Sequence, residues 1–254
     1  MNDTQHDRIY ASPRGHVTNF SFDERVARCF PDMINRSVPG YAQIVSMCGL
    51  FAERWLRPGG RLYDLGCSHG AVSLAVAERL PDRAWTITAV DLSNAMVTHA
   101  KRNFTTHVPA ARQQDIELLE ADVLALEYQP ASMIVLNFTL QFLPPEQRAG
   151  LIQRLFDALE PGGVLVLSEK ITRESSAIDA EIFDLHHDFK RANGYSQLEI
   201  SQKRTALEDV MITDTLTTHH QRLLDAGFER HFTWFEYLNF ASMVAIKASA
   251  EHAS

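Results

Sequence analysis

The chain has 254 residues, 45% of them hydrophobic and 22% charged, which is the composition of a globular protein with its own hydrophobic core. Its three cysteines form no CxxC pair, which argues against a disulfide framework and a zinc site. A net charge of −8 with scattered basic residues argues against direct nucleic-acid binding, and no apolar run reaches the roughly 18–20 residues of a membrane span, so we expect a cytoplasmic protein that binds a small molecule.

The N-terminal quarter of the chain predicts two helices followed by a strand. A helix is expected over 22–33 and is broken by Pro39-Gly40, and a second is expected over 41–56. A short strand is expected over 61–65 and runs into the glycine turn Asp64–Gly70. We therefore treat 1–58 as a helical extension that precedes the core.

Strands and helices alternate in the next part of the chain. The pattern predicts strands over 85–90, 115–120, 131–136 and 164–169, with helices over 71–80, 94–104 and 145–159. Such alternation indicates a parallel sheet with helices on both faces. Residues 61–170 would form this core.

The C-terminal part departs from the alternation. A largely helical insertion over 171–215 precedes a helix near 217–226, and strands over 232–237 and 240–247 are close enough to form an antiparallel hairpin. We expect one domain over 1–254, with 216–250 completing a mostly parallel seven-stranded sheet. This α/β arrangement resembles the Rossmann-like fold of class I methyltransferases.

The turn after the first strand is the first candidate ligand site. Gly66, Cys67 and Ser68 are small enough to let a ligand approach the backbone, and the helix that follows presents free N–H groups. Ser68 replaces the second glycine of a dinucleotide-binding turn, which disfavours a pyrophosphate. A turn of the chain without any ligand is the alternative, and Cys67 is expected to be a small neighbour of a ligand and not a nucleophile.

Polar residues also end the following strands, where open α/β sheets bind ligands. Asp91, followed by Leu92, lies at the spacing of an acid that accepts hydrogen bonds from ribose, although it could instead cap a helix. Asp122 and the Val123 amide are placed to meet an adenine, although Asp122 could be an ordinary loop acid. Asn137 ends the fourth strand and either faces a substrate or caps a turn. Together these ends predict a site for S-adenosyl-L-methionine.

Several stretches resemble the carboxy-S-adenosyl-L-methionine synthase family. They are FDERV (22–26), FPDMI (30–34), RSVPGY (36–41), DLGCS (64–68), VLNFTLQFL (135–143), LSEK (167–170), HHDFKRANGYS (186–196) and ISQKR (200–204). The similarity spans about 22–247, and residues 1–20 have no counterpart that we can name. It implies conversion of S-adenosyl-L-methionine and prephenate into carboxy-S-adenosyl-L-methionine and phenylpyruvate, through a sulfonium ylide that captures carbon dioxide. The product would pass to a tRNA carboxymethyltransferase that makes 5-oxyacetyl uridine at the wobble position.

The resemblance also implies roles for single residues. Arg204 would hold the new carboxylate of the cofactor, which a guanidinium binds through two parallel hydrogen bonds, so it is also our catalytic candidate. Tyr41 would offer its hydroxyl to the methionine end or the ribose. The resemblance does not locate prephenate, and the basic residues that the sequence offers to neutralise it are Lys203, Arg204 and the pair Lys190-Arg191. The family implies a homodimer. Adjacent His186 and His187 point about 100° apart on a helix, so we expect no metal.

Three other functions stay open from the sequence. An ordinary S-adenosyl-L-methionine-dependent methyltransferase acting on tRNA or a small molecule would leave Arg204 without a role. An NAD-dependent oxidoreductase is disfavoured by Ser68. A non-catalytic carrier of carboxy-S-adenosyl-L-methionine would bind the same ligand without making it.

Overall fold

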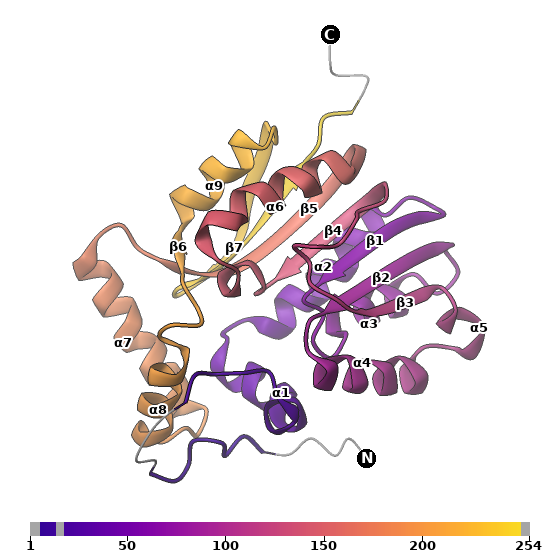
Figure 1. Cartoon of the computed structure of the whole chain (residues 1–254). Helices are drawn as coiled ribbons and strands as arrows, with labels where there is room; N and C mark the ends of the chain where they lie inside the picture. Colours follow the sequence, from indigo (N-terminus) through magenta and orange to yellow (C-terminus); the bar gives the residue numbers. More distant parts are fainter. Residues whose placement is uncertain (1–5, 14–17, 250–254) are drawn as a thin grey trace.

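A twisted sheet runs through the middle of the protein, and helices cover both of its faces (Figure 1). The computed structural model describes residues 6–13 and 18–249. The strand order is β3-β2-β1-β4-β5-β8-β7, with the short β6 paired to β5. The strands are β1 (Gly60–Leu65), β2 (Trp85–Asp91), β3 (Ile116–Glu120), β4 (Ala131–Asn137), β5 (Leu159–Thr172), β6 (Asp214–Thr215), β7 (Arg230–Tyr237) and β8 (Phe240–Ile246).

Side chains alternate between the two faces of the sheet, and each face has its own core. In β1, Leu62 packs with α2 (Tyr41–Trp55), α3 (Ala71–Arg79) and α4 (Asn94–His107) on one face. Tyr63 and Leu65 pack on the other face with α6 (Pro145–Ala158) and α9 (Leu216–Asp225). The central strand β4 is buried from Ala131 to Leu136, as expected for a strand covered on both sides. The ends of β1, β4 and β5 are thereby fixed in a packed core.

A third group of elements covers the carboxyl ends of the strands. It comprises α1 (Glu24–Ser37), α7 (Ser176–Ala192) and α8 (Gln197–Leu207), which lie together below the sheet in Figure 1. Asp23 caps α1, and Ser196 and Glu199 form a capping box at the start of α8. Tyr10 and Phe20 of the N-terminal segment belong to a core that also contains residues of α1, α4 and α8. This group forms a roof over the strand ends.

The insertion that carries α7 and α8 leaves the sheet and returns to it at one point. It departs after β5 and ends at β6, which pairs in parallel with the last residues of β5. The hydroxyls of Thr172 and Thr213 are hydrogen bonded across this junction. Fully buried Arg148 donates to Asp214, which fixes the returning strand to α6.

The predicted topology is confirmed, and several elements differ from the expectation in detail. The fifth strand begins at Leu159 and not at residue 164, because the chain re-enters the sheet there with an irregular register against β4. The two-residue β6 adds an eighth strand that its length hid from sequence patterns. The first helix spans Glu24–Ser37 and not 22–33. In the described part of the chain, no helix is long and apolar enough to cross a membrane.

Candidate active site

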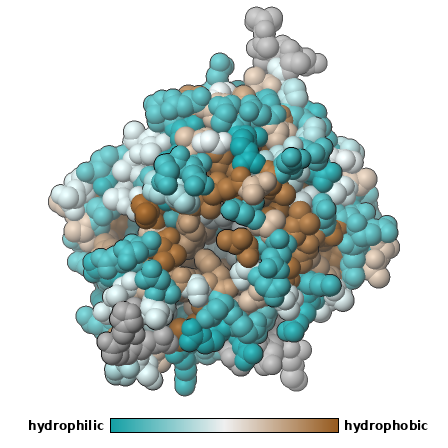
Figure 2. Space-filling view, in the orientation of Figure 1, coloured by the Kyte–Doolittle hydropathy of each residue, from teal (hydrophilic) through white to brown (hydrophobic). Residues whose placement is uncertain are grey.

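A cavity of about 330 Å³ lies between the strand ends and the roof helices. Figure 2 shows a hollow near the middle of this face, with hydrophobic side chains along much of its edge. The wall is formed by the ends of β1, β4 and β5 on one side and by α1, α7 and α8 on the other. This volume falls within the range of roughly 300–1,000 Å³ seen for small-molecule sites.

The glycine turn forms the floor of the cavity on the β1 side. The amides of Gly66 and Cys67 donate to the carbonyl of Val90, which pulls the turn against β2. Gly66 has a φ of +75°, and a Cβ there would lie 2.2 Å from the Thr139 hydroxyl oxygen. Ser68 also has a positive φ of 50°, which is uncommon for a residue with a side chain. The turn is therefore held in one conformation that presents its backbone to the cavity.

Asp91 holds the turn from the end of β2. Its two carboxylate oxygens accept hydrogen bonds from the amides of Ser68 at 2.8 Å and Ser93 at 2.9 Å. The N-cap of α4 is Ser93 and not Asp91. Burial raises the pKa of the Asp91 carboxyl, and the two amide bonds oppose that rise. An ionised carboxylate has about four acceptor sites, so two remain for a ligand.

The end of β4 forms the adjoining wall. The buried side-chain oxygen of Asn137 has no hydrogen-bond partner among the described residues, so it is available to a ligand. The next residues turn back through η1 (Leu140–Phe142), whose first two amides donate to the carboxylate of Glu169. The Gln141 side chain accepts from the amide of Lys170, which ties the ends of β4 and β5 together.

Positively charged side chains occupy the roof side of the cavity. Lys170, Lys190, Lys203 and Arg204 all line it. Burial and the neighbouring charges of Lys203 and Lys170 lower the pKa of Lys190 to about 7. Burial lowers the pKa of Lys170 as well. Lys170, Lys190 and Arg204 make no ion pair with any acid of the described chain, so their charges are available to an anion.

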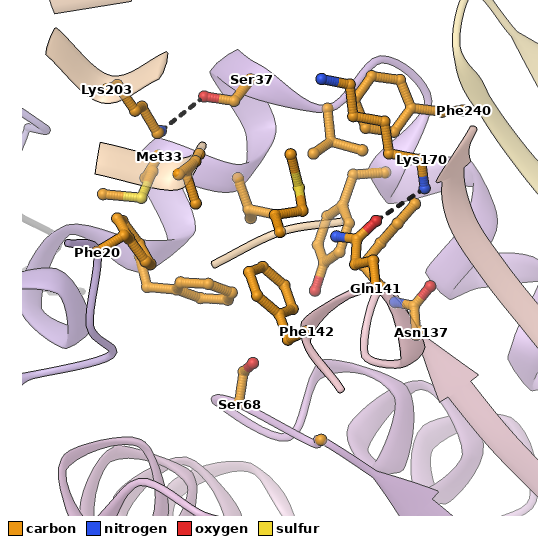
Figure 3. Close-up of a pocket in the computed structure, with 18 of the residues that line it drawn as sticks. Phe20, Met33, Ser37, Ser68, Asn137, Gln141, Phe142, Lys170, Lys203 and Phe240 are labelled. Carbon is orange, nitrogen blue, oxygen red and sulfur yellow. Dashed lines mark hydrogen bonds between the residues drawn. The ribbon is translucent and has the colours of Figure 1, made fainter. Parts of the chain in front are cut away.

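Aromatic side chains form the rest of the wall. Phe22 makes edge contacts with Phe20 and Phe142, with ring centroids 5.1 and 5.2 Å apart. Figure 3 shows Phe20 and Phe142 on the same side of the cavity, with Ser68 below them and Lys170 across from them. Tyr41 lines the cavity too, and burial raises the pKa of its hydroxyl, which keeps it a neutral hydrogen-bonding group. The cavity thus joins an apolar half to a cationic half.

The structure brings six of the ten predicted site residues to the cavity wall. They are Tyr41, Gly66, Cys67, Ser68, Asn137 and Arg204. Buried Cys67 has its pKa raised well above the usual value by desolvation, which makes its thiol a poor nucleophile.

The other four predicted residues lie along the ends of β2 and β3, outside the cavity wall. They are Asp91, Leu92, Asp122 and Val123. Leu92 is 71% exposed, and Val123 is buried in the core on one face of the sheet. Asp122 is exposed and accepts from the amide of Leu124, which is what an ordinary loop acid does. Their position fits a ligand that extends from the cavity along the strand ends.

The histidine pair is divided between two environments. His186 is buried, and its ring nitrogen is 2.8 Å from the carbonyl oxygen of Ser37, whereas His187 is half-buried against Phe183. Among the described residues, no three histidine, cysteine or acidic side chains are grouped as a metal site would need.

Sequence reasoning missed several residues of the cavity wall. Asp64 is 1% exposed and accepts from the amide and hydroxyl of Ser73, and burial raises its pKa to about 6. Its position at the end of β1 was a signal that could have marked it. Lys170 directly follows the strand expected over 164–169, within the resembling stretch LSEK, but lysines are rarely buried and the sequence alone did not mark it.

Comparisons with known proteins agree with this geometry. The methyltransferase domain model matches residues 62–163. The chain is 60% identical over 241 residues to the carboxy-S-adenosyl-L-methionine synthase of Chromohalobacter salexigens, covering 95% of this chain and 88% of the relative. It is 52% identical over 246 residues to the protein of the same name from Aeromonas hydrophila, covering 96% of each.

Solved structures show the fold more broadly. An O-methyltransferase family protein from Burkholderia thailandensis aligns with a TM-score of 0.63 at 19% identity, over 90% of this chain and 61% of that one. Human N-acetylserotonin methyltransferase in complex with S-adenosyl-L-methionine gives 0.59 at 16% identity, over 89% and 56%. These likenesses establish a class I methyltransferase fold, and the curated relatives are far more specific: the chain belongs to the carboxy-S-adenosyl-L-methionine synthase family.

Proposed function

We propose that this protein converts S-adenosyl-L-methionine and prephenate into carboxy-S-adenosyl-L-methionine and phenylpyruvate. The observation that carries the proposal is the cationic half of the cavity, where Lys170, Lys190 and Arg204 lack acidic partners in the described chain. S-adenosyl-L-methionine carries a positive charge at its sulfur, so binding this cofactor alone does not require a cluster of cationic side chains. Prephenate carries two carboxylates and the product gains one, so both suit a cavity with several unpaired positive charges.

The cofactor fits the wall that the strands provide. We place its methionine end over Gly66, Cys67 and Ser68, within reach of Tyr41 and Asn137. The buried Asn137 oxygen, which has no partner in the described part of the chain, supports this placement, because a bound amino or hydroxyl group would satisfy it.

The adenosine would extend outward along the next two strand ends. Asp91 and Leu92 would meet the ribose, with the free acceptor sites of the Asp91 carboxylate directed to its hydroxyls. Asp122 and Val123 would meet the adenine. Their location outside the cavity wall agrees with a ligand whose nucleoside lies on the open ends of the strands.

Arg204 would bind the carboxylate added to the cofactor methyl group. It projects from α8 into the cationic half, and its guanidinium carbon lies 5.0 Å from the centre of the Phe183 ring. Stacking on an aromatic ring leaves the edge of a guanidinium free to donate two parallel hydrogen bonds. A lysine at this position would keep the charge and lose that geometry.

The protein's own residues would orient the reactants and exclude water from the reaction. Prephenate supplies the carboxyl group as carbon dioxide and releases hydroxide as it aromatises, and the hydroxide takes the methyl proton to give water. The aromatic half of the cavity, with Phe20, Phe22 and Phe142, would limit water near the reacting carbon. Lys170 and Lys190 would hold the carboxylates of prephenate.

Isotope labelling tests the proposal directly. Purified protein is incubated with S-adenosyl-L-methionine and prephenate labelled with ¹³C in the carboxyl group that is lost, and the products are analysed by mass spectrometry. We expect labelled carboxy-S-adenosyl-L-methionine and an equal amount of phenylpyruvate. Absence of both would reject catalysis and favour a carrier, and methylation of an added tRNA or small molecule would favour an ordinary methyltransferase.

The partners and setting are also part of the proposal. We infer a homodimer and a cytoplasmic enzyme whose product passes to a tRNA carboxymethyltransferase for 5-oxyacetyl uridine at the wobble position. Exposed apolar residues on α7, Ile178 and Leu185, and half-exposed Tyr237 on β7 offer a surface that a second copy could cover. Light scattering coupled to size-exclusion chromatography gives the mass, and a monomer at micromolar concentration would contradict the dimer.

A further inference from the structure

An acid from the N-terminal segment is buried next to the cationic half of the cavity. Asp7 is only 2% exposed. Its carboxylate accepts from the Tyr195 hydroxyl at 2.5 Å and lies 3.7 Å from the ammonium nitrogen of Lys203. The resemblance to the enzyme family gives this part of the chain no role, and a carboxylate so deeply buried requires a charged or hydrogen-bonding partner.

The segment that carries Asp7 is fixed by side chains of the roof helices. The Gln202 amide on α8 donates to the carbonyls of Tyr10 and Ser12, both at 2.9 Å. The Asp7 amide donates to the carboxylate of Asp32 on α1 at 2.7 Å. The segment that carries Asp7 is therefore held between α1 and α8.

Lys203 connects this buried acid to the cavity. It is 7% exposed, lines the cavity, and donates to the Ser37 hydroxyl at 3.1 Å, as Figure 3 shows. It directly precedes Arg204 on α8. Any change in the orientation or charge of Lys203 therefore alters the electrostatic potential in the part of the cavity where the anionic ligands are proposed to bind.

The charge of Lys203 depends on the balance between burial and its neighbours. Burial lowers its pKa to about 8, and the Asp7 carboxylate is the strongest group acting in the opposite direction. The groups that face it from the surrounding elements are Asp7, Cys29, Arg36, Tyr195 and Lys190. Cys29 has a raised pKa and is neutral in this range, while Arg36 and Lys190 disfavour a further positive charge. Asp7 is the only carboxylate among these groups.

We propose that Asp7 is a positioning residue of the active site, which keeps Lys203 protonated and directed at Ser37 so that the cavity retains its charge for anionic ligands. The segment over 6–13 would then be a working part of the site and not a dispensable extension. The inference rests on the proposed function for the identity of the anions. The effect of Asp7 on the charge of Lys203 does not depend on which anion binds.

The test compares pH profiles of kcat/KM for prephenate in the wild type and Asp7→Asn. Asparagine keeps the size of the side chain and an acceptor for Tyr195, and removes only the charge. If the pKa of Lys203 falls by about one unit, to near 7, kcat/KM of the variant at pH 8 falls about fivefold and recovers toward the wild-type value near pH 6. KM should carry the change, because a lost cation weakens anion binding.

A second substitution separates charge from folding. In Asp7→Asn with Lys203→Arg, the guanidinium stays protonated without a buried acid, so activity at pH 8 should rise above that of Asp7→Asn alone. Asp188→Asn is the matched control, because it removes an exposed acid paired with Arg191 on the outside of α7. Its profile should match the wild type.

Two results would overturn the inference. One is an Asp7→Asn variant, folded by circular dichroism, whose pH profile has the wild-type shape. The other is a uniform loss of activity at every pH, since a purely structural role lowers all points alike. If the wild type does not turn over prephenate, the proposed function fails independently. The same variants are then compared by the pH dependence of carboxy-S-adenosyl-L-methionine affinity, in which the same shift is expected.

Discussion

Substitution of Gly66 by alanine should destabilise the protein more than the same substitution at Gly59, a glycine with the same backbone φ. Gly66 and Gly59 both have a φ of +75°, but a Cβ at Gly59 meets nothing within 4 Å. A Cβ at Gly66 would lie 2.2 Å from the Thr139 hydroxyl oxygen and 2.6 Å from its methyl carbon. Gly59→Ala therefore measures the backbone cost alone, and Gly66→Ala adds a steric cost.

The two costs can be estimated separately. A left-handed alanine costs about 1–2 kcal/mol, which is the whole expectation for Gly59→Ala. Overpacking adds about 1–3 kcal/mol, so Gly66→Ala should lose about 2–5 kcal/mol of unfolding free energy. At roughly 2–4 °C per kcal/mol for a chain of this size, its Tm should fall by about 4–20 °C. Urea denaturation followed by fluorescence gives the free energies.

Removal of the Thr139 side-chain atoms that clash with the new Cβ should restore only the steric part of the unfolding free energy lost in Gly66→Ala. Thr139→Ala deletes the two nearest atoms and leaves its own Cβ, 3.0 Å from the new one. Alone it loses the hydrogen bond from its hydroxyl to the Leu65 carbonyl, about 0.5–1.5 kcal/mol. The double variant should be about 1–3 kcal/mol more stable than the sum of the two single losses predicts. Additive losses, or equal losses in Gly66→Ala and Gly59→Ala, would refute the reasoning.

Three further predictions concern the ligands. Arg204→Lys should weaken carboxy-S-adenosyl-L-methionine binding by about 10- to 100-fold through loss of charge-assisted hydrogen bonds, and S-adenosyl-L-methionine binding by far less. Equal losses in calorimetry would remove Arg204 from the carboxylate role. Tyr41→Phe should weaken S-adenosyl-L-methionine binding by about 3- to 10-fold with an unchanged Tm, and a stability loss without an affinity loss would make Tyr41 a packing residue. Because burial and neighbouring cations lower the pKa of Lys190 to about 7, its charge is lost as the pH rises through 7, so carboxy-S-adenosyl-L-methionine affinity should fall between pH 6 and 8. That dependence should flatten in Lys190→Arg, and an unaltered slope would exclude Lys190.

The sheet was predictable because its signals are local. Short apolar runs such as 131–136 have the length of buried strands, and the two-residue separation of the last strands favoured a hairpin. The ends of these strands then gave the candidate site, since parallel strands end at the same edge of the sheet. Membership of the family was confirmed by the relatives, while the ligand roles of the ten residues stay predictions.

The cationic half was only partly predictable because it depends on contacts distant in sequence. Lys203 and Asp7 are far apart in the chain, and no local pattern marks a surface-type residue as buried. Lys170 shares the cavity with Lys190 and Arg204 only because the insertion folds back over the strand ends. The sequence alone also left two possible roles for Asp91, as an acid that binds ribose or as a helix cap. The structure shows it bound to both the turn and the start of α4, with capacity to spare.

The junction between Thr172 and Thr213 separates the segment that carries the cationic side chains of α7 and α8 from the sheet that forms the cofactor wall. Because the chain departs and returns at one place, the whole segment with α7 and α8 is a closed excursion from the sheet. The entropic cost of such an excursion grows slowly with its length, so segments of other lengths and sequences can occupy the same place. The strands and the glycine turn can be common to many enzymes that use the same cofactor. The segment between the two threonines is where an enzyme with this core can acquire its second substrate.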